Sequence, residues 1–381
     1  MGHAIIAGVA DTPLGKLPGK GSMQLHLEMA DAAARDAGIG LQDIDGVITL
    51  GSRADPYSRH GCAFAEAAGI IGQLRYCDTK TGSGSSAASA LIEATDLVSH
   101  GRCSTMLVVS GENSLTGVMR DQAVANMAAF RHKQYEMPYG LLNPTGYALI
   151  AQRYQIEFGA SDEDRAKVAV IMRRNAMKNP KAQFQEPLTI DDVLGSPVIS
   201  SPLRKLECSP ISDGGAAFIV TNRISGRPTV EVIGAGRAYA PYDHICQLRD
   251  LYDFGIARAT KEACDQAGLK SSDIDLVFVY DCYTITVLIQ LEEMGFCSRG
   301  EAPKLVDDIY RGRVRFGFNT DGGLLSHGHP GPPSGMYAIV EAVRQLRGEA
   351  GERQQSSPRH AIINGNGGIL SVQATVILQR G

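Results

Sequence analysis

Two short stretches of the chain carry side chains that could transfer protons or attack a carbonyl. His327 and His329 stand among glycines and prolines, and an imidazole can donate or accept a proton near neutral pH. Tyr280, Asp281 and Cys282 directly follow an apolar run. A phenol can donate a hydrogen bond to a developing oxyanion, and a thiol can act as a nucleophile. Each of these residues also has a structural interpretation. His329 could pack the loop, Tyr280 could belong to the core, and Cys282 could simply be buried, which is the favoured interpretation for Cys282.

The composition narrows the kinds of site to expect. The eight cysteines include no CxxC pair, which argues against structural zinc and against a secreted disulfide framework. The formal net charge is -4 and no basic block exceeds a pair, so neither nucleic acid nor an anionic membrane is expected as a partner. The first residues run straight into an apolar strand, and no stretch approaches the ~20 apolar residues of a membrane span. We expect a cytoplasmic protein with no bound metal or cofactor.

The elements that must position these residues recur in the two halves of the chain. Residues 36–47 contain DAGI and, three residues later, DIDGV; residues 266–277 contain QAGL and, three residues later, DIDLV. A helix precedes each copy and an apolar strand follows it, and a second helix and strand come later in each half. The matching elements are helices 25–37 and 256–267, strands 47–50 and 277–280, helices 85–100 and 334–347, and strands 105–110 and 360–364.

The repeat predicts how the chain divides. A polar linker at 222–228 (TNRISGRP) separates the copies, which places one half at residues 1–225 and the other at 226–381. Residues about 112–200 have no counterpart in the second half, so we interpret them as a largely helical insertion that could cap a site. Continuously apolar strands alternating with helices predict an α/β protein whose sheets are covered on both faces.

Several segments resemble thiolases, especially the sterol-carrier or lipid-transfer branch. The run FNTDGGLLSHGHPGPPSG at 318–335 resembles the N-x-x-GG … GHP-x-G signature of that family. The likeness extends over nearly the whole chain, through residues 139–148, 173–192, 202–217, 280–283 and 364–371. It implies a thiolase fold with two similar halves in a five-layered αβαβα core, usually a homodimer. It also implies a CoA thioester bound in a channel between the halves.

The nucleophilic cysteine of that family is missing. Thiolases of this branch carry a G-A-C-A-S-G-G turn at the start of a buried helix, and GSGSSAA at 82–88 matches this turn. Gly84 then stands at the nucleophile position, whereas a shift of one turn would place Thr81 there. A helix start supplies free N–H groups that stabilise negative charge, so Gly84 could still act as a backbone donor. Ser85 could donate a hydrogen bond to substrate, although capping the helix is the favoured interpretation.

The resemblance also implies roles for other residues. His329 corresponds to the histidine that hydrogen-bonds the thioester carbonyl, and Tyr280 stands where the branch often has histidine. Asn319 shapes the channel, and His327 is either a second polar wall or a solvent-facing neighbour. Gly367, in NGNGG, stands where many thiolases have a second catalytic cysteine and is a candidate backbone donor, although a tight turn with positive φ would explain such a glycine equally well.

Three functions stay open from the sequence. The first is retro-aldol cleavage of a 3-hydroxyacyl-CoA, because steroid side-chain-cleaving aldolases of this branch also lack the cysteine, have tyrosines in the site and depend on a DUF35-type zinc-ribbon/OB-fold partner. Pro332-Pro333 departs from them, since their second tyrosine is absent. The second is thiolysis or acyl transfer of an unusual 3-ketoacyl-CoA, with CoA attacking directly or through Cys282. The third is a non-catalytic acyl-CoA or lipid-binding subunit. In each case coenzyme A enters as part of the substrate.

Overall fold

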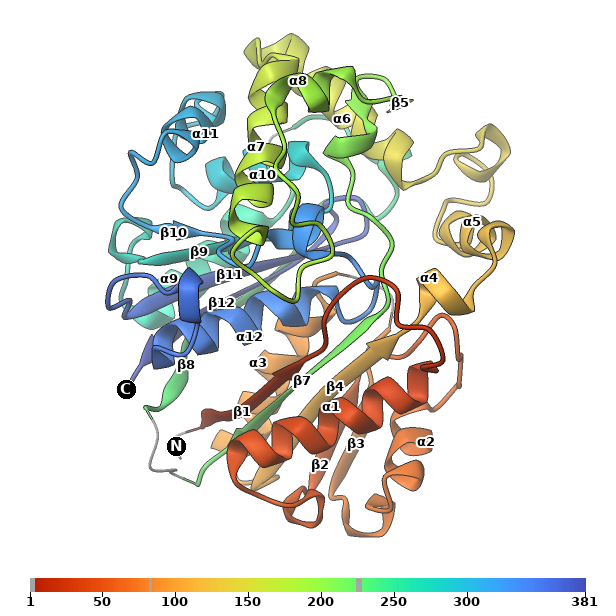
Figure 1. The fold of residues 1–381 in the computed structure, drawn as a ribbon, viewed down its shortest axis with the longest axis vertical. Helices are drawn as coiled ribbons and strands as arrows, with labels where there is room; N and C mark the ends of the chain where they lie inside the picture. The colour runs from red at the N-terminus through yellow and green to blue at the C-terminus, as the bar shows by residue number, and fades with distance from the viewer. Residues whose placement is uncertain (1–3, 82–83, 224–227, 252) are drawn as a thin grey trace.

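The strands of the two halves form one continuous sheet. The computed structural model describes residues 4–81, 84–223, 228–251 and 253–381. The strands of the first half are β1 (Ile5–Asp11), β2 (Gly46–Thr49), β3 (Tyr76–Thr79), β4 (Thr105–Glu112) and β7 (Gly214–Thr221). Those of the second half are β8 (Val230–Tyr239), β9 (Leu276–Val279), β10 (Gly317–Phe318), β11 (His360–Gly367) and β12 (Val372–Arg380). Across the described ranges their order is β10-β9-β11-β12-β8-β1-β7-β4-β2-β3 (Figure 1).

The two halves of this sheet share one topology, which confirms the predicted repeat. Read outward from the β1–β8 junction, β1-β7-β4-β2-β3 and β8-β12-β11-β9-β10 have the same parallel and antiparallel pairings. The repeated aspartates also do the same work. The Asp45 carboxylate accepts the backbone N–H of Ser104 and Thr105 at the start of β4, and the Asp275 carboxylate accepts those of Arg359 and His360 at the start of β11.

The helices complete a five-layered core. On the outer faces, α1 (Ser22–Ala37) and α2 (His60–Ala67) cover the first half, while α9 (Ile256–Ala267) and α10 (Thr284–Glu293) cover the second. Between the halves lie α3 (Ser86–Ser99) and α12 (Ser334–Arg347), which contact each other and strands of both halves (Figure 1). Alanines 87, 88 and 90 let α3 pack closely on both sides. The predicted αβαβα thiolase fold is therefore confirmed.

The segment between β4 and β7 is largely helical, as predicted. It contains α4 (Ser114–Gly117), α5 (Arg120–Ala129), α6 (Asn143–Phe158), α7 (Asp162–Ala176), α8 (Ile190–Gly195) and the short strands β5 (Val198–Ser200) and β6 (Leu203–Arg204). Both α6 and α7 pack against α10, and α11 (Ala302–Tyr310) packs against α7. The predicted boundary at 225/226 falls outside the described residues and stays a prediction. None of the helices in the described ranges is both long enough and apolar enough to cross a membrane.

A pair of buried histidines, His26 in α1 and His60 at the start of α2, predicts a loss of stability in mild acid. The rings of His26 and His60 lie 4.6 Å apart, and burial, then His60, lower the pKa of His26 from 6.5 to about 3. The folded protein resists protonation of His26, whereas the unfolded chain does not. The contribution of His26 to the free energy of unfolding is therefore complete above pH 6.5 and declines as the pH falls below it. Between pH 7 and pH 5 we expect a loss of about 2 kcal/mol from His26, measured by chemical denaturation. His26→Gln should remove this part of the pH dependence. If the free energy of unfolding falls with pH equally steeply in the wild type and the variant, His26 is not the cause.

Candidate active site

The two central helices begin next to each other. A Cβ placed on Gly335, in the first turn of α12, would lie 2.8 Å from the carbonyl oxygen of Gly84, so a glycine is needed for this close approach. Beside Gly84 is a cavity of about 20 Å³, roughly the space of one water molecule. Its walls come from the starts of α3 and α12, the ends of β9 and β11, and the π-helix Gly323–His327. Two positive helix ends therefore point at one small space.

Tyr280 and His329, both predicted as catalytic, are hydrogen-bonded to each other. The Tyr280 Oη lies 3.0 Å from Nε2 of His329. The Gly331 N–H donates to Nδ1 of His329 at 3.3 Å, and a backbone N–H can only donate, so in the neutral ring the proton sits on Nε2 and points at the phenol. Burial, then the charge of Arg53, lower the pKa of His329 to about 4, while burial raises the pKa of Tyr280. Near pH 7 the site holds a neutral imidazole and a neutral phenol.

The Tyr280 ring fills the space that a side chain at position 84 would need. A Cβ added to Gly84 would lie 2.4 Å from Cζ of Tyr280 and 2.3 Å from the carbonyl oxygen of Asn366. Real Cβ atoms do not approach other atoms this closely, so position 84 has no room for a thiol. None of the described residues that line the cavity is a cysteine. Gly84 therefore contributes its backbone at the predicted nucleophile position.

Cys282 is poorly suited to replace the missing thiol. It is buried and is not among the cavity-lining residues. Burial raises the pKa of its thiol to about 12, and the charge of Asp281 adds to the rise. A thiol attacks as its thiolate, and at pH 7 this thiol is protonated. This environment agrees with the structural interpretation of Cys282.

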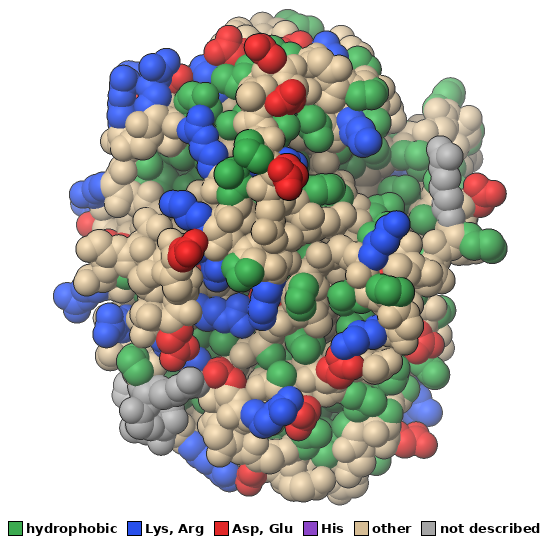
Figure 2. All heavy atoms as spheres, in the orientation of Figure 1, with side chains coloured by type: hydrophobic (Ala, Val, Ile, Leu, Met, Phe, Trp, Pro, Cys, Tyr) green, Lys and Arg blue, Asp and Glu red, His purple; other side chains and the backbone are tan. Residues whose placement is uncertain are grey.

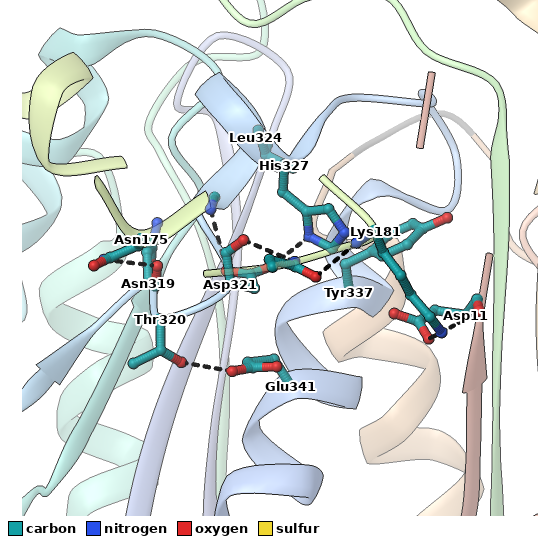
Figure 3. Close-up of polar contacts among 12 residues, drawn as sticks. Asp11, Asn175, Lys181, Asn319, Thr320, Asp321, Leu324, His327, Tyr337 and Glu341 are labelled. Carbon is teal, nitrogen blue, oxygen red and sulfur yellow. Dashed lines mark hydrogen bonds and ion pairs between the residues drawn. The ribbon is translucent and has the colours of Figure 1, made fainter. Parts of the chain in front are cut away.

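Asn319 lines the cavity, but hydrogen bonds to other parts of the protein occupy its amide. Its Oδ1 accepts the N–H of Val279 at 2.9 Å, and its Nδ2 donates to the carbonyl of Val279 at 3.0 Å and to Asp281 at 3.2 Å. Its backbone has φ of 35°, which is rare for a residue other than glycine. Asn319, which Figure 3 shows beside Asn175, therefore ties down the end of β9, the strand that leads into Tyr280.

Asp281 joins this strand end to the π-helix. Its carboxylate accepts the N–H groups of Leu324 at 2.7 Å and Leu325 at 3.1 Å, in addition to the amide of Asn319. Burial raises the pKa of Asp281 to about 7, although the two backbone hydrogen bonds oppose the rise. Single π-helical turns are frequent at functional sites, and this one carries His327 and leads into His329.

His327 does not face solvent, so that alternative is wrong. The side chain is 3% exposed and its Nδ1 lies 2.9 Å from Oδ2 of Asp321 (Figure 3). Its ring meets the Tyr337 ring edge to face at 5.1 Å between centroids. Its Nε2 has no hydrogen-bond partner among the described residues, and the residue lines the cavity. It is a polar wall, as the other alternative predicted.

Two other expectations need correction. Ser85 is the N-cap residue of α3 and is buried, but its side chain makes no capping hydrogen bond, because its backbone is already helical with φ of -79° and ψ of -7°. Gly367 is the last residue of strand β11 and does not line the cavity. The positive φ expected there belongs to Gly368 instead, at 63°.

Two residues near the site, Tyr147 on α6 and Ser334 at the start of α12, were not predicted from the sequence. The Tyr147 hydroxyl donates to the carbonyl of Gly368 at 3.0 Å and accepts from Asn366 Nδ2 at 3.3 Å, so the insertion reaches the site. Ser334 is 1% exposed and lines the cavity beside Tyr280. Tyr147 lies within residues 139–148, which resemble thiolases, and this resemblance was the only sign in the sequence that it could be near the site. Ser334 is a routine residue for a helix start, so its type revealed nothing.

Asn319→Ala is expected to destabilise the protein by about 2–4 kcal/mol and to abolish activity. The change leaves the N–H and carbonyl of Val279 without partners in the core, and alanine tolerates a positive φ poorly. Thermal denaturation and an activity assay on the folded fraction would measure both effects. Asn175→Ala is the matched control, because it also removes an amide that contacts this loop but leaves Val279 satisfied. Equal stability losses in both variants would contradict the role given to Asn319.

Comparisons with known proteins agree with this geometry. Residues 4–223 match the family model of the thiolase N-terminal domain, and residues 238–380 match the thiolase C-terminal domain-like model. A steroid side-chain-cleaving aldolase from Thermomonospora curvata is 34% identical over 372 residues, 91% of each chain. An acetyl-CoA acetyltransferase from Methanothermobacter thermautotrophicus is 29% identical over 388 residues, 100% of each chain. A solved Ltp2-ChsH2(DUF35) aldolase has a TM-score of 0.87 at 31% identity, covering 99% of this chain and 98% of that one. The chain belongs to the thiolase family.

Proposed function

We propose that this chain cleaves the Cα–Cβ bond of a 3-hydroxyacyl-CoA by a retro-aldol reaction, without a cysteine acyl-enzyme. The observation that carries the proposal is the position of the Tyr280 phenol. It is hydrogen-bonded to His329 and occupies the space of the missing thiol. The site therefore offers neutral proton donors and two helix starts, which suit a reaction that passes through an enolate.

The reaction can be written with the residues in place. The substrate's 3-hydroxyl loses its proton, its C–O bond becomes a carbonyl, and the electrons of the Cα–Cβ bond move into the thioester, forming an enolate. Tyr280 accepts a hydrogen bond from His329, which makes its own O–H a stronger proton donor, so the phenol can take up the substrate's proton and pass on its own. The positive ends of α3 and α12 stabilise the negative charge of the enolate. Protonation of Cα then yields an aldehyde or ketone and a shorter acyl-CoA.

The relatives suggest the substrate and partner classes. One is named a steroid side-chain-cleaving aldolase, and the solved neighbour is an aldolase with a DUF35 subunit. By this likeness, the substrate of this chain is a CoA thioester with its hydroxyl on a bulky acyl group, and a DUF35-type protein joins a homodimer of the chain in the cytoplasm.

An exposed apolar segment supports a protein partner: Met119, Phe130, Tyr135, Met137 and Tyr139 are 80, 47, 58, 42 and 81% exposed. They flank the projecting α5, where Figure 2 shows hydrophobic side chains.

The decisive experiment asks whether cleavage needs free CoA. The chain, co-expressed with a DUF35-type subunit, is incubated with 3-hydroxyacyl-CoA thioesters, including a steroid side-chain thioester, without added CoA. We expect a carbonyl product and a shorter acyl-CoA in equal amounts, unchanged after thiol alkylation. A strict requirement for free CoA, or an acyl group trapped on Cys282, would instead identify a thiolase. Full activity of the assembled His329→Ala protein would identify this chain as a non-catalytic subunit.

A further inference from the structure

The proposed reaction requires a group that takes up the proton of the substrate's hydroxyl. The two residues at the reacting end are poorly suited to hold it. Burial lowers the pKa of His329 to about 4 and raises the pKa of Tyr280, so neither gains a positive or negative charge readily near pH 7. A good general base has a pKa close to the working pH. Tyr280 can pass a proton on, but it needs an acceptor behind it.

The second imidazole of the loop, His327, is arranged as an acceptor. The neighbouring Asp321 fixes its Nδ1 at 2.9 Å and itself receives the Gly323 N–H at 3.1 Å. Burial raises the pKa of Asp321, but the opposing effects, led by the hydrogen bond from His327, lower it overall, so this carboxyl is an anion. A buried carboxylate on Nδ1 orients an imidazole and stabilises its protonated form. The other nitrogen, Nε2, is then the one that can take a proton.

The free nitrogen of His327 opens onto the cavity that Tyr280 also lines. Neither Nε2 of His327 nor Oγ of Ser334 has a hydrogen-bond partner in the described part of the chain, although these residues are only 3% and 1% exposed. Buried polar atoms are seldom left unpaired in folded proteins, so such atoms usually bind a ligand or an ordered water. The cavity of about 20 Å³ has room for one water molecule, whose partners would include these two atoms.

We propose that His327 is the proton acceptor at the end of a relay that runs from the substrate's hydroxyl through Tyr280 and one water in the cavity. This inference rests on the proposed retro-aldol function. As the substrate O–H bond breaks, its proton joins the Tyr280 oxygen, the Tyr280 proton moves to the water, and a water proton forms the Nε2–H bond of His327. The electron pair left on the substrate oxygen forms the new carbonyl, and the pair of the Cα–Cβ bond forms the enolate. The reverse relay returns the proton towards Cα.

The other titratable groups at the cavity do not compete for this role. Asp281 also lines the cavity, and burial raises its pKa to about 7, but its two oxygens already accept the N–H groups of Leu324 and Leu325 and the amide of Asn319, so a proton there would disrupt the contacts that hold the π-helix. The Tyr337 hydroxyl donates to the carbonyl of Gly215 at 3.0 Å, away from the relay. His327 is therefore the group at this cavity with an open acceptor position and a charge partner behind it.

His327→Gln tests the relay, because glutamine keeps a polar side chain but cannot take up a proton. In the assembled, CoA-free assay we expect kcat to fall about 100-fold and KM to change less than about twofold. Because only an unprotonated His327 can accept the proton, kcat/KM of the wild-type protein should rise with pH. This rise should disappear in His327→Gln. Asp321→Asn should shift this rise to lower pH, since it removes the anion that stabilises the imidazolium. Ser334→Ala, which removes one partner of the water, should lower kcat about 10-fold.

The matched control is His100→Gln, the same change at an exposed histidine on the far end of α3. It should match the wild-type rate and pH profile. If His327→Gln does not fold, Asp321→Asn and Ser334→Ala decide the question by their pH profiles and kcat values. If the wild-type protein cleaves without CoA but the relay variants keep the wild-type rate and pH profile, the relay alone is overturned. A wild-type protein that does not cleave would overturn the proposed function and the relay with it.

Discussion

Tyr280→Phe is expected to lower kcat for CoA-free cleavage about 1,000-fold, with KM changed less than about threefold. Phenylalanine keeps the ring that packs against Gly84, so the substrate channel keeps its shape. It removes the hydroxyl that accepts from His329 and faces the reacting groups. Because this hydroxyl passes on a proton that moves only during the reaction, its loss should affect the chemical step and leave substrate binding nearly intact.

Tyr242→Phe is the matched control for this prediction. Its hydroxyl donates to the carbonyl of Ile369 at 2.9 Å, and the side chain is buried outside the cavity lining. We expect a stability loss of about 1 kcal/mol and activity within about threefold of wild type. Steady-state kinetics on both variants, after a check of their melting temperatures, make the comparison. A Tyr280→Phe enzyme as active as the control would remove Tyr280 from the chemistry.

Gly84→Cys should abolish the aldolase activity without producing a thiolase. The new Cβ would overlap Cζ of Tyr280 at 2.4 Å and the backbone of Asn366 at 2.3 Å, so the Tyr280 ring must leave its place. Overpacking of this kind costs about 1–3 kcal/mol of stability, and kcat should fall at least about 100-fold as the phenol moves. The assay measures cleavage with and without CoA, and mass spectrometry of the intact protein looks for an acyl adduct.

Alanine variants separate the steric effect from the thiol. Gly84→Ala introduces the same Cβ and should lose nearly as much activity as Gly84→Cys. Gly72→Ala is the control, because a Cβ there has no neighbour within 4 Å. A Gly84→Cys protein that forms an acyl-enzyme and cleaves 3-ketoacyl-CoA with CoA would show that the tyrosine yields easily, contrary to this prediction.

Much of the architecture could be predicted because it depends on local patterns. Helices α9 and α12 have the predicted bounds, since Gly268 and Gly348 end them in the left-handed conformation. The repeated Asp45 and Asp275 pointed to equivalent strands, and these aspartates bind the starts of β4 and β11. Tyr280 and His329 were each predicted as site residues from the family-like motifs that carry them, and the structure shows that they are hydrogen-bonded to each other.

The rest of the site depends on distances between segments that are remote in the chain. That the Tyr280 ring overlaps the volume beside Gly84 follows from the way β9 and α3 meet across the central layer. Whether His327 faces water or a buried carboxylate depends on the turn that brings Asp321 back to it. Tyr147 reaches the site only because α6 folds over the second half. The missing capping bond of Ser85 depends on its backbone angles, which residue type does not determine.

The overlap of positions 84 and 280 also constrains how such proteins diverge. A nucleophile at the first position and an aromatic ring at the second exclude each other, so related sequences should show the two positions changing together. A lineage that moves from one chemistry to the other must pass through a form that is either overcrowded or hollow, and neither form is expected to be a good catalyst. Reading these two residues as a pair should therefore sort uncharacterised relatives more sharply than a search for the cysteine alone.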